Sequence, residues 1–385
     1  MSIKDSLSKI FLQIHDREPI RQYDLYGVNV EVRRSDKKKV ENLLKALSSI
    51  PTGQQAIDDL KKHETVLLFD SGLDAKGGFF KDQNRIKLND KGLTPDEMKF
   101  VLVHEARHLS QWKHGRKEIE SQKLDYATRL MINRATEADA DTQALKACKE
   151  WEAMGDTGPL KKFAECRETM VAAYNKCASL SDAFKGWFDR EATTSAYEHS
   201  YDTMPYMSMI GRPIEGDYVS LKPADIKNFC GADRVEGFEN FMESKQARQV
   251  HLLTKTMVEL CDEAHSASGM PHDPSLKDIP LKDLKENHEA RLCAATYIKK
   301  ARESFGYKLF EEESDPLVKN AIDCVEKMNA AAIEGKHDSD AEKGLKNVKE
   351  NIRAHFTPAP VKKKTPRDKS VKTSQIIAIR NGNGR

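Results

Sequence analysis

The sequence lacks any hydrophobic run long enough to cross a membrane, and its cysteines form no pairs. No segment approaches the roughly 18 apolar residues that a spanning helix requires. Residues 1–19 mix charged and apolar side chains and lack the apolar centre of a secretion signal. The seven cysteines are scattered without a CxxC pair, which excludes a zinc ribbon and indicates free thiols in a reducing compartment. We therefore expect a cytoplasmic protein, unless a dedicated secretion system exports it as an effector.

The chain also has almost no net charge, but its charge is unevenly distributed. The total is +2, whereas residues 358–385 carry eight Lys or Arg against Asp368, a balance of +7. The body before them is therefore at −5, which argues against a nucleic-acid-binding core and leaves weak contact with polyanions to the tail. The composition of residues 357–385 predicts a disordered basic tail. Oligomeric state leaves no mark in the sequence.

Hydrophobic periodicity predicts an α+β protein that is predominantly helical. Residues 36–49 and 52–62 have helical spacing, and residues 65–70 suit a short strand. Residues 77–90 predict a hairpin around a polar turn. From residue 159 onward the pattern is helical almost throughout. We expect a small antiparallel sheet covered by helices.

Two longer helices follow the predicted hairpin. The first should begin at Thr94, which can form a capping box with Glu97 and is followed by Pro95 at the first helical position. It should end at Gly115, because glycine adopts the backbone conformation that ends a helix. The second is expected over about residues 120–154, which contain no Pro or Gly.

Residues 104–108 read His-Glu-Ala-Arg-His, an HExxH motif on the first of these helices. His104 and His108 are four residues apart and therefore share a helix face, where one tetrahedral zinc ion can reach both. Glu105 lies beside them, placed to hold and deprotonate a water on zinc. The apolar residues 100–103 bury this helix and argue against a chance pair of surface histidines.

Zinc needs a third protein ligand, and the second helix offers Glu137. Asp141 is four residues further on the same face, where it can accept a hydrogen bond from a ligand histidine and fix its tautomer. The second helix can approach the first closely because it carries small residues at Ala135, Ala138 and Ala140. Arg107 is expected to make a helix-surface ion pair with Glu137 or Asp139.

His114 is the competing third ligand, because it follows His104 by ten residues, as in HExxHxxGxxH sites. Those sites use a glycine to turn the chain back, and this sequence has Gln111 there. The difference favours Glu137 and leaves His114 as a cation near a helix C-terminus.

The segments VLVHEARHLSQ and NRATEADADTQA resemble the gluzincin-type zincin metallopeptidases, which combine HExxH with a downstream ExxxD. The likeness is greatest to bacterial metallopeptidases whose motif reads HExRH, and it covers residues 35–150. It implies a bound Zn2+ with His104, His108 and Glu137 as ligands. It also implies that Glu105 is the general base and that Asp141 is the hydrogen-bond partner of His104.

We expect a zincin-like metallopeptidase domain over residues 1–155, with two active-site helices. A helical region over residues 156–356 should pack against it and complete the cleft, either as a separate domain or as a second lobe of the same domain. By analogy, Ile86 to Leu88 would be the edge strand that lines the cleft and pairs with an extended peptide.

The predicted function is zinc-dependent hydrolysis of peptide bonds in a protein or peptide substrate, with a zinc-activated water and Glu105 as general base. The oxyanion needs a further donor, for which Tyr197, His199 and Tyr201 are the densest cluster. One alternative is a catalytically silent zincin-fold interaction protein, although a silent relative often loses the general base that is present here. The other alternative is a zinc hydrolase of a non-peptide amide.

Overall fold

The computed structural model describes residues 18–189, 217–248, 272–279 and a few positions between 323 and 347. Contacts divide the chain into two compact units, and the first consists of Met1–Lys117, Thr136–Phe188 and Asn228–Glu236. The predicted domain boundaries at residues 155 and 356 stay predictions. The predicted tail, residues 357–385, lies outside the described residues.

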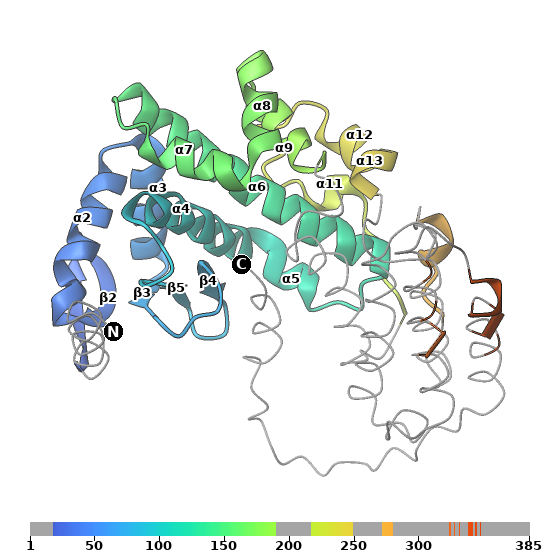
Figure 1. Cartoon of the computed structure of the whole chain (residues 1–385), viewed down its shortest axis with the longest axis horizontal. Coiled ribbons are helices and arrows are strands. Elements are labelled where there is room, and N and C mark those ends of the chain that lie inside the picture. Colours follow the sequence, from blue (N-terminus) through green and yellow to red (C-terminus); the bar gives the residue numbers. More distant parts are fainter. Residues whose placement is uncertain are drawn as a thin grey trace, which may run out of the picture. The chain divides into compact units, whose positions relative to one another are not determined.

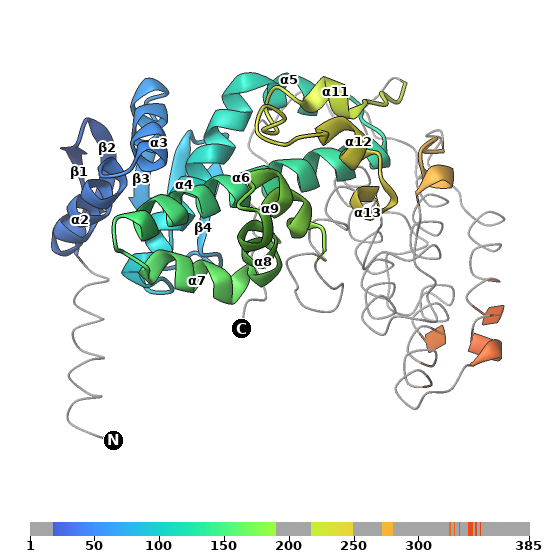
Figure 2. The same ribbon diagram turned by 90° about the horizontal axis from the view of Figure 1, so that it is seen from above.

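The first unit contains a five-stranded mixed sheet (Figures 1 and 2). In the order in which they lie side by side, the strands are β1 (Ile20–Leu25), β2 (Val28–Arg33), β3 (Val66–Phe69), β5 (Arg85–Leu88) and β4 (Gly77–Phe80). The pairs β1–β2 and β4–β5 are antiparallel hairpins, whereas β3 is parallel to both of its neighbours. The predicted α+β class with mostly helical structure is confirmed, but the small sheet is mixed and not antiparallel as expected. Two helices separate β2 from β3 in the chain, and a helical crossover returns the chain in the same direction.

The strand at the edge of the sheet also differs from the one expected by analogy. Ile86 to Leu88 belong to β5, which lies between β3 and β4. The tight turn between β4 and β5 places β4 next to β5 at the end of the strand order. β4 therefore forms the edge of the sheet nearest the HExxH helix.

The helices of the first unit agree with most of the sequence predictions. They are α2 (Lys37–Ser48), α3 (Pro51–Lys62), α4 (Pro95–Gln111), the end of α6 (Tyr126–Ala153), α7 (Gly158–Cys166), α8 (Glu168–Cys177) and α9 (Leu180–Trp187), with a short η1 (Arg34–Asp36). The valines of β2 are buried, as are the apolar stripes of α2 and α3. These buried side chains form a core that the sheet shares with α2 and α3, and this core holds the sheet in place against the two helices.

The chain between α4 and α6 and the described part of the second unit contain shorter elements. They are η2 (Trp112–Arg116), α5 (Lys117–Glu120), α11 (Pro223–Ile226), α12 (Phe238–Met242), α13 (Lys245–Arg248) and η3 (Leu276–Asp278). Among the described helices, none is long and apolar enough to cross a membrane.

The ends of the two long helices show how local sequence sets them. Thr94 and Glu97 form the predicted capping box, in which Glu97 accepts from the backbone N–H of Thr94 at 2.9 Å. The regular part of α4 ends at Gln111, and the positive φ of Gly115 (124°) closes the turn that follows. α6 begins later than predicted, because Asp125 accepts a hydrogen bond from the N–H of Thr128 and so starts the helix there.

β4 packs against α4 without an intervening side chain at Gly77. A Cβ at Gly77 would lie 2.7 Å from Val101 Cγ1 and 3.2 Å from Glu105 Cγ, both on α4. We expect Gly77→Ala to lower the free energy of unfolding by about 1–3 kcal/mol, because the added methyl overpacks this contact. Chemical denaturation monitored by circular dichroism measures the change.

Gly78→Ala is the matched control for this prediction. Its Cβ would meet only the edge of the Phe80 ring, at 3.1 Å, and that ring can move. Its effect should stay below about 1 kcal/mol, since alanine is not disfavoured relative to glycine in a strand. Combining Gly77→Ala with Val101→Ala should cost less than the sum of the two single changes. Equal effects of the two glycine substitutions would contradict the close packing of β4 on α4.

Candidate metal centre

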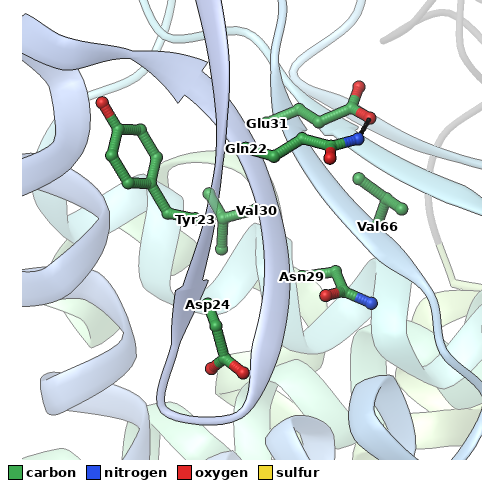
Figure 3. Close-up of a pocket in the computed structure, with 7 residues that line it drawn as sticks. All are labelled: Gln22, Tyr23, Asp24, Asn29, Val30, Glu31 and Val66. Carbon is green, nitrogen blue, oxygen red and sulfur yellow. Dashed lines mark hydrogen bonds between the residues drawn. The ribbon is translucent and has the colours of Figure 1, made fainter.

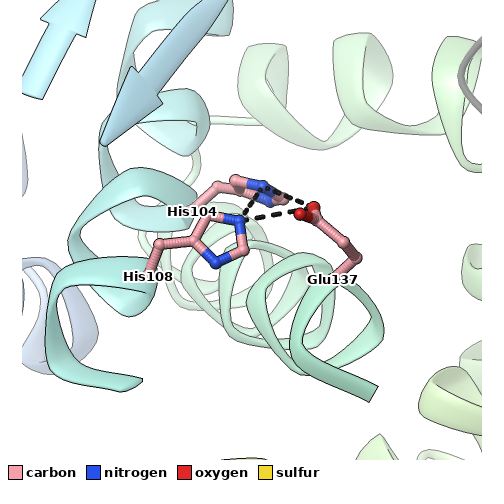
Figure 4. Close-up of side chains that lie close together, drawn as sticks. All are labelled: His104, His108 and Glu137. Carbon is pink, nitrogen blue, oxygen red and sulfur yellow. Dashed lines mark hydrogen bonds and ion pairs between the residues drawn. The ribbon is translucent and has the colours of Figure 1, made fainter. Parts of the chain in front are cut away.

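Three buried side chains from α4 and α6 point their electron-pair donors at one another (Figure 4). His104 Nε2 and His108 Nε2 are 3.0 Å apart, and they lie 3.4 and 3.3 Å from Glu137 Oε2. Glu137 is 1% exposed, and both histidines are also buried. In the described part of the chain, no other group of three His, Cys, Asp or Glu side chains comes together in this way.

The helices bring the three side chains together through their spacing and their close approach. His104 and His108 are one turn apart on α4, with their rings edge to face. On α6 the flanking residues Ala135, Ala138 and Ala140 are fully buried, as the prediction of a close helix contact requires.

The second ring nitrogen of His104 is held by a chain of polar contacts. His104 Nδ1 lies 2.9 Å from Asp141 Oδ1. The other oxygen of Asp141 accepts from Arg167 Nε at 2.5 Å and from Trp187 Nε1 at 3.0 Å. Because Asp141 accepts, His104 carries a proton on Nδ1 and directs Nε2 at Glu137.

The charges around His104 are strongly coupled. Burial disfavours a charge on its ring, but the carboxylate of Asp141, together with Glu137 and Glu105, outweighs burial and raises the pKa of His104 to about 10. Burial likewise opposes ionisation of Asp141, yet Arg167 and His104 hold the pKa of its carboxyl well below the usual range. A neutral solution therefore leaves a proton on His104 Nε2, between the acceptors, unless another cation takes its place.

This donor set fits a divalent metal ion. Two neutral imidazole nitrogens and one carboxylate oxygen are the ligands of many catalytic metal sites. The three donors converge, are buried and need one positive charge to offset their mutual repulsion. A metal ion at this position displaces the proton from His104, so its affinity falls as the pH falls. The residues present therefore can hold a metal.

Glu105 does not belong to the three-residue group but lies next to it. Its carboxylate is close enough to contribute to the raised pKa of His104. Its side chain is buried beneath β4, where Gly77 leaves room for it.

His114 is directed away from this group. Its Nδ1 donates to the backbone carbonyl of Ser110 at 2.6 Å, within the irregular turn that ends α4. Arg107 does pair with Asp139, with its Nε 2.5 Å from Asp139 Oδ2, but the pair is mostly buried instead of lying on the helix surface. The proposed oxyanion donors Tyr197, His199 and Tyr201 lie outside the described residues.

Four polar residues around the group were not expected from the sequence. Gln111 contacts His108 Nδ1 through Oε1 at 2.8 Å, and its i+3 spacing from His108 was a signal that could have revealed it. The others are Arg167, Trp187 and Arg234, which reach the group through Asp141 and Asp139. Their distance in sequence gives no local signal.

A separate hollow of about 320 Å³ lies on the strands β1, β2 and β3 (Figure 3). Gln22 donates to its cross-strand partner Glu31 at 3.2 Å. The hollow contains no histidine or cysteine and shares no residue with the group on α4 and α6; it is lined by Gln22, Tyr23, Asp24, Asn29, Val30, Glu31 and Val66.

A family model described as "Putative metallopeptidase family (DUF6782)" matches residues 28–207, slightly less than half of the chain. The match includes His104, His108 and Glu137, and supports a metal-dependent peptidase at the level of the family. No curated protein and no solved structure matches the chain.

Proposed function

We propose that the protein is a zinc-dependent metallopeptidase that hydrolyses peptide bonds in a protein or peptide substrate. The observation that carries this proposal is the buried convergence of His104, His108 and Glu137 beside Glu105. The family match over residues 28–207 supports it independently.

Zinc is the proposed metal because of the donor atoms and their separations. Bonds of about 2.0–2.1 Å in a tetrahedron place donors about 3.3 Å apart. The observed separations are 3.0, 3.3 and 3.4 Å. A site with three protein ligands keeps the fourth position open, which is typical of catalytic zinc.

In the proposed mechanism, His104, His108 and Glu137 would hold the zinc ion, which would supply Lewis acidity for activating water and polarising the scissile carbonyl. Glu105 accepts a proton from the attacking water and passes it to the leaving amine. Asp141 keeps the proton of His104 on Nδ1 and thereby keeps Nε2 available as a ligand. Arg167 and Trp187 fix the carboxylate of Asp141 in turn.

We propose β4, in place of Ile86 to Leu88, as the strand that pairs with an extended substrate. β4 forms one edge of the described sheet and packs over Glu105 through Gly77. A peptide that adds to this edge gains backbone hydrogen bonds and passes close to the general base. Tyr197, His199 and Tyr201 stay a prediction for the oxyanion donors.

Two measurements on the wild-type protein, its zinc content and its cleavage of peptides, test the proposal. We expect about one zinc ion per chain by elemental analysis. We also expect cleavage of a mixed peptide library, with products identified by mass spectrometry, that stops on chelation and returns with zinc. Bound zinc without cleavage of any peptide would redirect the proposal to a non-peptide amide. A folded protein that neither contains nor takes up zinc would contradict it.

A further inference from the structure

The amide of Gln111 lies between His108 and α6 in an orientation that its neighbours determine. Its Nε2 faces two acceptors, the backbone carbonyl of Thr136 at 2.9 Å and Asp139 Oδ2 at 2.8 Å. An NH2 group satisfies both acceptors, so the carbonyl oxygen must face His108 Nδ1 at 2.8 Å. His108 Nδ1 therefore carries the proton, and its Nε2 offers a lone pair toward Glu137 and His104.

Asp139 holds this amide in place. Its carboxylate is 1% exposed, which is costly unless the charge is paired. Two guanidinium groups pair with it: Arg107 donates to Oδ2 from α4, and Arg234 donates to Oδ1 from residues 228–236. Each oxygen of the carboxylate therefore has its own cation, and Oδ2 remains directed at Gln111.

Residues 228–236 pass very close to this carboxylate. Gly231 has φ 67°, and a side chain there would collide with Asp139 and with Arg234. Arg107 Nη2 also reaches the backbone carbonyl of Phe229. The segment belongs to the same compact unit as α4 but lies beyond residues 28–207, which the family model matches.

We propose that Gln111, Asp139 and Arg234 form a positioning relay that fixes the ring and the tautomer of His108. Segment 228–236 is then part of the metal centre, although it contributes no ligand. The relay mirrors the one on His104, where Asp141 is held by Arg167 and Trp187. The inference rests on the proposed zinc site, and it does not depend on which bond the protein hydrolyses.

Zinc affinity, measured by competition with a chelator, tests the relay in the full chain. Gln111→Met keeps the volume but removes both the acceptor and the donors, and Arg234→Met removes one cation from Asp139. Each should weaken zinc binding by about 10–100-fold, the usual effect of losing a residue that orients a ligand. Arg234→Lys, which keeps the charge, should restore part of the affinity.

Arg85→Met is the matched control, because Arg85 makes a two-pronged pair with Glu31 at 2.7 and 3.1 Å in the same unit. It loses a comparable ion pair away from the metal centre and should change zinc affinity by less than about twofold. If Arg85→Met weakened zinc binding as much as Arg234→Met, a general loss of stability would explain the effect on zinc affinity. That result would overturn the relay. So would a failure of Arg234→Lys to recover any affinity.

A second readout needs neither zinc nor activity. In metal-free protein with ¹⁵N-labelled histidine, two-bond ¹H–¹⁵N correlations show which ring nitrogen is protonated. We expect the proton of His108 on Nδ1 in the wild type. In Gln111→Met this proton loses its acceptor, so it should exchange faster with water and its resonance should move upfield, with His104 unchanged. A wild-type proton on His108 Nε2 alone would overturn the relay. If the proposed zinc-dependent function were wrong but the relay were right, this tautomer pattern would still be observed. Failure of the relay and failure of the proposed function are therefore distinguishable.

Discussion

Replacing Glu105 with glutamine should lower the rate of peptide hydrolysis by about 10²–10⁴-fold, the usual contribution of a general base. Glutamine keeps the shape of the side chain beneath β4 but cannot take a proton from water. Because Glu105 is not one of the three converging donors, zinc should stay bound. Single-turnover cleavage of a peptide substrate, together with zinc content of the same preparation, measures both effects.

Glu41→Gln provides the control for loss of a carboxylate. Glu41 lies on α2 and pairs with the nearby helical lysines Lys37 and Lys38. Its neutralisation should leave cleavage unchanged, since exposed helix pairs contribute little. Unchanged cleavage by the Glu105 variant with zinc bound would show that another group acts as the base. Loss of zinc would instead assign Glu105 to metal binding.

Glu137→Ala should abolish zinc binding under conditions in which the wild type is fully loaded. It removes the only carboxylate oxygen that contacts both histidine nitrogens among the described residues. The loss should exceed the roughly 10–100-fold that follows removal of an orienting residue. Zinc should raise the melting temperature of the wild type but not of this variant, because only a form that binds the ligand gains stability from it.

His114→Ala distinguishes the two candidate third ligands. Its ring is bonded to Ser110 on the turn after α4, so zinc affinity should remain close to that of the wild type. Removing the buried charge of Glu137 also changes the stability of the metal-free protein. Zinc binding by the two variants is therefore compared through the shift in melting temperature that zinc causes in each variant. Loss of zinc in His114→Ala with retention in Glu137→Ala would favour a three-histidine site.

The parts of the fold that could be predicted from sequence were those that local chemistry determines. Thr94 and Glu97 define the start of α4 through a capping box, and Gly115 closes the turn that follows the helix. Helical periodicity then places His104 and His108 on one face and Glu137 and Asp141 on another. The convergence of the two faces was an inference from small residues on α6, and the structure has these residues buried.

Most of the fold that the sequence did not predict depends on contacts between distant segments. The β1–β2 hairpin is an exception, because the alternating valines of β2 after Gly27 are a local signal for it. The parallel pairing of β3 with β2 and β5 has no such signal, because register between distant strands is set by the whole sheet. The same holds for Arg234, which meets Asp139 from 95 positions along the chain.

The order of the chain has a consequence for synthesis on the ribosome. All three donor residues lie between residues 104 and 137, on helices that are close in sequence, so they can meet at a small cost in loop-closure entropy. Arg234 is translated considerably later. Because domains form as the chain emerges, the nascent protein can capture its metal before the last cation reaches Asp139. If the proposed site takes up its ion at this stage, the His108 ring is fixed only afterwards, when residues 228–236 have been made.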